Sequence, residues 1–170
     1  LDFHRRIAAV QHFSKLPESQ ALAVANKRVS NILAKENFAI ETQSVDPQLL
    51  RESAEKSLFK NIDNKVLEVA PLFASGNYRD GLESLAGLKD SVDLFFDEVL
   101  VMCDDASLRS NRIALLQQLR SLFLQVADIS HLDTCLATRG NNLPLFSVVG
   151  AVILSTFLTV FQCHFFRFHI

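Results

Sequence analysis

The chain has 170 residues, 49% of them hydrophobic, which fits one domain with a real core and excludes a disordered chain. Its net charge is −2, and residues 1–132 carry 15 Lys and Arg against 18 Asp and Glu, so any nucleic-acid surface must be local. Its three cysteines, Cys103, Cys135 and Cys163, form no CxxC pattern, which argues against a disulfide framework or a zinc site and favours a reducing, cytosolic setting.

Apolar residues recur at helical spacing from the start of the chain. Phe3, Ile7, Val10 and Phe13 predict an amphipathic helix over residues 2–13. A second helix is predicted from Pro17, a typical helix-start residue, to residue 35. Its expected inward side chains are Leu22, Ala25, Val29, Ile32 and Leu33.

A third helix is indicated by Asp46 before Pro47, a cap followed by proline at the first helical position. Gly76 and Asn77 mark its end. Pro71 predicts a kink or a break, because a proline inside a helix removes a backbone hydrogen bond. The expected inward residues are Leu58, Phe59, Ile62, Val66, Val69 and Phe73.

Residues 78–100 continue the apolar series, and Gly87 makes two helices with a bend as plausible as one. Asp104 and Asp105 supply an N-cap for a final core helix that runs antiparallel to the preceding one. Its predicted apolar face comprises Leu108, Leu115, Leu116, Leu119, Leu122, Phe123, Val126 and Ile129. The predicted fold class is all-α, a helical bundle of about five to six helices plus a separate apolar C-terminal helix.

The composition changes abruptly after Leu132. Residues 133–142 are predicted to form a polar linker, with Gly140 as a helix breaker. Residues 143–163 contain no formally charged side chain, and a helix of 21 residues is long enough to cross a bilayer. Residues 143–170 are therefore either a membrane anchor for the bundle in residues 1–132 or a non-native, frameshifted or read-through extension. The chain begins at Leu1 and its only methionine is Met102, so we expect a fragment of a longer polypeptide.

Several strings in residues 1–132 resemble the beta subunits of bacterial tetrameric glycyl-tRNA synthetases. They are ALAVANKRVSNILAK, YRDGLESLAGLKDSVDLFF and the stretch from VDLFFDEVLVMCDD to LFLQVADIS. The resemblance implies a helical anticodon-binding domain, related to the C-terminal domain of arginyl-tRNA synthetases. It also implies tRNA(Gly), the rest of the beta subunit and the alpha subunit as partners in a cytoplasmic alpha2beta2 enzyme. Aminoacylation, with its ATP and Mg, would belong to the whole enzyme, because the beta chain contributes tRNA recognition.

Two sets of polar residues are candidates for nucleic-acid contact. Lys27, Arg28, Asn31 and Lys35 share one side of the second helix, where they would meet phosphates and base edges. The alternative is an ordinary solvated face, which the pattern alone favours. Arg109, Asn111 and Arg112 lie in the first turns of the final helix, where exposed N–H groups favour an anion.

For this second set the structural alternative is that Asp104 and Asp105 cap the helix and pair with Arg109 or Arg112. An anticodon binder also needs exposed rings, and the candidates are Phe95, Phe96 and Tyr78, although such residues are more often packed in a core. Neither the five histidines nor any other motif has catalytic or metal-ligand spacing. We therefore expect no catalytic residue, no metal site and no cofactor in this chain.

Overall fold

The computed structural model describes residues 2–35 and 44–132. These residues form six α-helices and two short 3-10 turns, without a strand, so the predicted all-α bundle of five to six helices is confirmed for them. The α-helices are α1 (Asp2–Phe13), α2 (Ser19–Lys35), α3 (Ser53–Ala74), α4 (Tyr78–Ala86), α5 (Lys89–Glu98) and α6 (Ala106–Leu124), and the 3-10 turns are η1 (Pro47–Leu49) and η2 (Ile129–His131).

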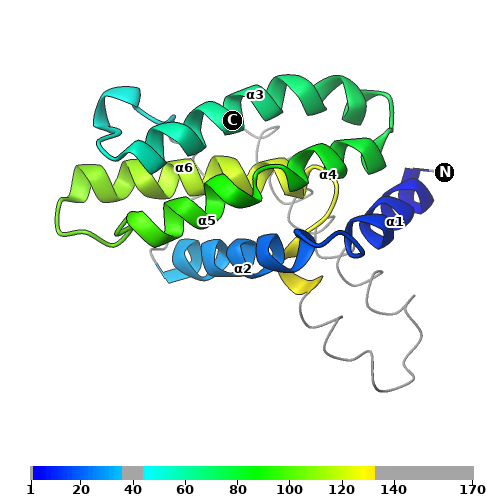
Figure 1. Ribbon diagram of the computed structural model, residues 1–170, viewed down its shortest axis with the longest axis horizontal. Helices are drawn as coiled ribbons and strands as arrows, with labels where there is room; N and C mark the ends of the chain where they lie inside the picture. The colour runs from blue at the N-terminus through cyan, green and yellow to red at the C-terminus, as the bar shows by residue number, and fades with distance from the viewer. Residues whose placement is uncertain (1, 36–43, 133–170) are drawn as a thin grey trace, which may run out of the picture.

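The helices pack side by side along one long direction, with α3 on one edge and α2 on the other (Figure 1). Helix α6 lies between them and packs against both, while α4 and α5 follow α3 back along its length. The core is continuous, and the predicted inward face is buried from Leu115 to Phe123 in α6 and at Val126 and Ile129 beyond it. At one end of the bundle, Phe13 of α1 and Phe123 of α6 meet with their ring centroids 6.3 Å apart.

Helix α3 corrects two expectations. Asp46 does cap a turn, accepting a hydrogen bond from Gln48 N at 2.9 Å, but that turn is only η1. The long helix begins at Ser53 instead, where Glu52 and Glu55 form a capping box. Pro71 does not break α3, which continues to Ala74, so the predicted break is wrong and the alternative, a kink, stays a prediction. Pro71 lies on the exposed side near the helix end, where water can reach the carbonyl that loses its partner.

Helix α3 ends where the sequence predicts. Gly76 adopts φ = 75°, a left-handed conformation that favours glycine. Asn77 N donates to Leu72 O at 2.8 Å and Gly76 N donates to Phe73 O at 3.0 Å, which together complete a Schellman motif. The motif reverses the chain so that α4 returns along α3.

Two further details differ from the periodic pattern. Phe3 and Val66 were expected inside but are each 41% exposed, because α1 packs mainly against α4 and the buried side of α3 centres on Leu58, Ile62 and Val69. Helix α6 also ends at Leu124, and the apolar residues after it are buried in a segment that leads into η2, which packs against α2. The division of residues 78–98 into two helices at Gly87 matches one of the two predicted alternatives.

None of the helices that the structure describes is both long and apolar enough to span a bilayer. The apolar segment of residues 143–163, the predicted linker and the proposed C-terminal helix lie outside the described residues.

Candidate nucleic-acid interface

Helix α2 has a sharply divided surface. Leu22, Ala23 and Val29 on one side are completely buried, whereas Lys27, Arg28, Asn31 and Lys35 on the other side are all exposed. The division follows from helical spacing, because residues three, four and seven apart share a face. The first set of predicted residues therefore lies on one accessible surface, which we call the α2 basic face.

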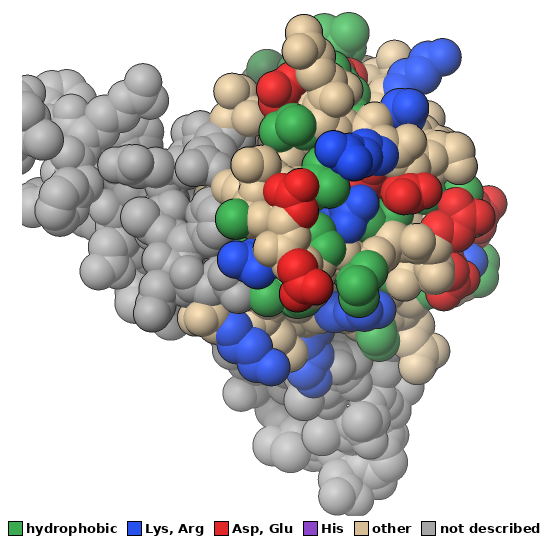
Figure 2. Space-filling view, turned by 90° about the vertical axis from the view of Figure 1, so that its left-hand side faces the viewer, with side chains coloured by type: hydrophobic (Ala, Val, Ile, Leu, Met, Phe, Trp, Pro, Cys, Tyr) green, Lys and Arg blue, Asp and Glu red, His purple; other side chains and the backbone are tan. Residues whose placement is uncertain are grey.

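The α2 basic face has no acidic neighbour on its own helix. The sequence of α2, SQALAVANKRVSNILAK, contains three basic residues and no Asp or Glu. Figure 2 shows Lys and Arg side chains gathered at the lower edge of the bundle end, at the height of α2, with acidic and basic side chains intermixed above. Such a local positive surface can attract phosphate although the net charge of the chain is negative.

The neighbouring helix α5 has the opposite character. Its single basic residue, Lys89, lies 2.8 Å from Asp93 and 3.4 Å from Asp90. The hydrogen bond that Lys89 donates to Asp93, together with the negative charge of that carboxylate, raises the pKa of Lys89. The basic charge of α5 is thus engaged by its own helix, whereas the basic residues of α2 have no acid on theirs.

One residue of the α2 basic face reaches across to α5. The guanidinium carbon of Arg28 lies 4.4 Å from the centroid of the Phe96 ring, within the range of a cation–π contact. Phe96 in turn meets Phe95 edge-on, with centroids 5.6 Å apart and an interplanar angle of 79°. Phe95 is completely buried and cannot be a platform, whereas Phe96 is only partly buried.

The second predicted set does not form a surface. Asn111 is 6% exposed, and its side chain accepts from Asp46 N at 2.7 Å and donates to Asp46 O at 3.0 Å. Those two bonds fasten the segment before η1 to α6. Because both of its polar side-chain atoms are occupied inside the protein, Asn111 presents no group to RNA.

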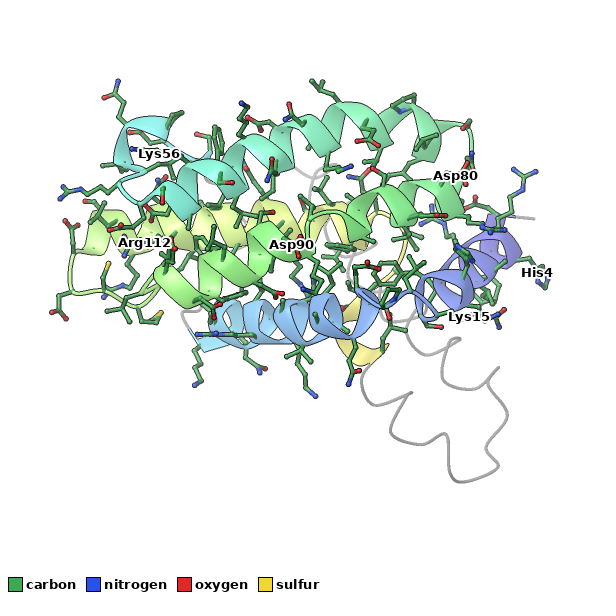
Figure 3. All side chains as sticks on the ribbon, viewed as in Figure 1. His4, Lys15, Lys56, Asp80, Asp90 and Arg112 are labelled. Carbon is green, nitrogen blue, oxygen red and sulfur yellow. The ribbon has the colours of Figure 1, made fainter. Side chains whose placement is uncertain are left out.

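Arg112 is also internal, with 6% of its surface exposed. It forms an ion pair with Glu55 of α3 and donates through Nη1 to Leu100 O at 2.8 Å. Figure 3 shows it at the end of the bundle where α6 starts, below Lys56 of α3. The predicted RNA contacts of Asn111 and Arg112 thus need correction, because their side chains join helices instead of facing solvent.

Arg109 is partly exposed and donates to Cys103 O at 3.1 Å, so it braces the loop before α6. The predicted cap at Asp105 is confirmed, since its carboxylate accepts from Ser107 N at 2.9 Å and from Leu108 N at 3.1 Å. The expected pairing of Arg112 with Asp104 or Asp105 is wrong, because Glu55 takes that place.

Tyr78 packs as a corner residue. It is 7% exposed, donates to Asp2 Oδ1 at 2.7 Å and accepts from Arg6 Nη2 at 3.1 Å. Burial, followed by the hydrogen bond to Asp2, raises the pKa of the Tyr78 hydroxyl. Its ring is covered by the Arg6 guanidinium, 4.4 Å away, and so is not available to a base.

Sequence reasoning missed the contact between Arg28 and Phe96, because nothing in a one-dimensional pattern relates residues on separate helices. The absence of acid from α2 could have been found by counting charge helix by helix. Within residues 2–35 and 44–132 no group of three His, Cys, Asp or Glu side chains could hold a metal ion.

Comparisons with known proteins add independent information. Residues 22–133 match the family described as the DALR anticodon binding domain. Three proteins named glycine–tRNA ligase beta subunit are similar to the chain: those of Marinobacter nauticus (54% identical over 134 residues), Aeromonas salmonicida (55% over 133) and Pseudoalteromonas translucida (54% over 133). These alignments cover 78–79% of the chain but 19% of each relative, so the chain spans about a fifth of their length.

Proposed function

Because the chain belongs to the DALR anticodon-binding domain family, we propose that it is the tRNA anticodon-binding module of a glycyl-tRNA synthetase beta subunit. In this role it contributes to the recognition of tRNA(Gly) for aminoacylation. The structural observation that supports the proposal is the α2 basic face, an exposed row of cations and an amide without a carboxylate on the same helix.

The mechanism follows from the chemistry of that face. Lys35 and its neighbours hold backbone phosphates, which positions the RNA but carries no sequence information. Asn31 has an amide that donates and accepts, so it can bond the edge of a base in an unstacked loop. Arg109, at the start of α6, is a further candidate for phosphate contact beyond this face.

Catalysis is assigned to other parts of the enzyme. We place the ATP- and Mg²⁺-dependent formation of glycyl-tRNA outside this chain. The partners we propose are tRNA(Gly), the rest of the beta subunit and the alpha subunit, in a cytoplasmic alpha2beta2 assembly. The size of the curated relatives, of which the chain covers 19%, supports the view that most of the enzyme lies elsewhere.

The proposal is tested by titrating the chain with tRNA(Gly) and with the same tRNA carrying a changed anticodon. Tighter binding of tRNA(Gly) is expected, since each mismatched base contact weakens recognition. Equal affinity would remove the claim of anticodon recognition, and no binding of either RNA would remove the claim of RNA binding.

Two double variants show whether α2 is the contact surface. Asn31→Ala with Lys35→Ala should weaken binding of tRNA(Gly), whereas Lys56→Ala with Lys60→Ala, both exposed on α3, should not. Comparable losses in the two variants would place the interface somewhere other than α2.

A further inference from the structure

The contact between Arg28 and Phe96 has the form of a prepared stacking site. Phe96 packs edge-on against Phe95, which is fully buried, so one side of its ring is supported by the core. Arg28 covers Phe96 from α2 and yet remains exposed. One side of its guanidinium therefore rests on the ring while the other side is open to solvent.

No acidic side chain among residues 2–35 and 44–132 pairs with Arg28. In the part of the chain that the structure describes, Arg28 makes no ion pair, and α2 itself contains no Asp or Glu. This distinguishes Arg28 from Arg6, which covers Tyr78 in the same manner but lies 2.9 Å from Asp2 and also bonds backbone carbonyls. The Arg6 contact is structural, whereas among the described residues no side chain bonds the outer side of Arg28.

The surroundings of Arg28 suit one class of ligand. Asn31 follows it by three residues and Lys35 by seven, so both lie on the same helix face. Val24, 53% exposed, lies one turn before it. A planar cation beside an amide, a lysine and a small apolar side chain matches the ring, edge and phosphate of an unpaired nucleotide.

We propose that Arg28, supported by Phe96, is the platform on which one unstacked base of the tRNA anticodon loop is bound. The inference rests on the proposed function and adds to it a specific residue pair from two helices. Arg28 contributes stacking as well as charge, since its planar guanidinium covers a base in a way that a lysine ammonium does not.

The test compares conservative variants for binding to an anticodon stem-loop of tRNA(Gly), measured by fluorescence anisotropy. Arg28→Lys keeps the charge and removes the planar group, and Phe96→Leu removes the supporting ring. Each should weaken binding about tenfold, the loss expected when the stacking of one base is removed. Arg79→Lys on α4 and Phe59→Leu on α3 make the same changes elsewhere and should bind like the original chain.

An abasic scan of the loop identifies the stacked base. At one loop position, removal of the base should weaken the binding of the original chain. The same removal should not weaken the binding of Arg28→Lys, because that variant has already lost the stacking contact. If Arg28→Lys weakens binding by the same factor for every abasic stem-loop, Arg28 contacts only phosphate and the proposed stacking platform is wrong.

The two proposals fail in distinguishable ways. A chain that binds the stem-loop with full affinity after Arg28→Lys and Phe96→Leu has no platform, while its anticodon-binding role stands. A chain that does not bind the stem-loop at all loses both. Because Phe96 packs on the core, the thermal unfolding of Phe96→Leu is measured beside the titration. If Phe96→Leu is unfolded, the test is decided by Arg28→Lys, which changes an exposed side chain.

Discussion

Glu55 is completely buried, and its carboxylate is bonded by three groups. One oxygen accepts from the backbone N–H groups of Arg51 and Glu52, each at 2.8 Å, and the other accepts from Arg112. A buried charge is tolerated only when it is paired and hydrogen-bonded. This single residue therefore caps α3 and joins it to α6.

Replacing Arg112 with alanine should destabilise the domain by about 3 kcal/mol, because Glu55 would be left as an uncompensated buried charge. The measurement is urea unfolding followed by circular dichroism. Arg109→Ala is the matched control and should cost about 1 kcal/mol, since Arg109 is partly exposed and its side chain donates to a carbonyl. Similar costs for the two variants would contradict the assigned role of Arg112.

Asp128 makes stability depend on pH. Burial by itself would raise the pKa of this carboxyl, but the hydrogen bonds from Ser130 and the charge of Arg120 outweigh it and lower the pKa below the ordinary value of 3.8. The folded state thus binds the proton less tightly than the unfolded state. Its contribution to stability is present above about pH 4 and is lost as the pH falls through the lowered pKa.

Asp128→Asn should therefore destabilise the chain at about pH 6, and the difference from the original chain should shrink as the pH falls below about 4. Unfolding free energies at a series of pH values measure this. A difference that stays constant with pH would show that the ionisation of Asp128 does not contribute.

At the scale of elements, the packing of α4 on α3 depends on a missing side chain. A Cβ atom at Gly81 would lie 2.2 Å from Cε1 of Phe73, far inside the contact distance of two carbon atoms. Gly81 is buried, so the two helices approach each other at this point as closely as their backbones and the Phe73 ring allow. The same helices are also joined by Lys65, which donates to Ser84 Oγ at 2.9 Å.

Gly81→Ala should cost about 1–3 kcal/mol in unfolding free energy, because overpacking forces the helices apart. Adding Phe73→Leu should restore part of that loss, since the obstructing ring is removed. Gly87→Ala is the control: its Cβ would meet Ser84 O at 3.3 Å, a much milder contact. Additive effects of the Gly81 and Phe73 changes would mean that the two residues do not oppose each other.

For the whole molecule, the distribution of charge matters more than its sum. The chain is negative overall, yet α2 carries three basic residues and no acid. α5, packed against α2, is predominantly acidic. Under the proposed function, this unequal distribution would orient an RNA loop so that its phosphates meet α2 and not the acidic residues of α5.

Lys35→Ala should lower the salt dependence of binding to the stem-loop by about 0.7 in the slope of log K against log salt, the value for one phosphate contact of a single strand. Lys60→Ala on α3 removes the same charge from the molecule and should leave the slope unchanged. The slopes come from titrations at several salt concentrations. Equal changes would mean that net charge, and not the α2 face, controls binding.

The sequence alone determined the helical class, most helix bounds and most of the core. These follow from the spacing of apolar residues and from local signals, such as Asp105 before α6 and Gly76 after α3, that act within a few residues. The resemblance to anticodon-binding domains was also visible in the sequence, and the family match confirms it. The exposure of Lys27, Arg28, Asn31 and Lys35 followed from the same periodicity.

Only the tertiary structure decided which polar residues face outward when the pattern around them is ambiguous. Asn111 and Arg112 have the chemistry of RNA contacts, but α6 is packed on more than one side, so both are enclosed and bonded to Asp46 and Glu55. The support of Arg28 by Phe96 was equally invisible, because the two residues meet only when α2 packs on α5. Burial and contact between helices depend on how the helices are placed, and local spacing carries no information about that placement.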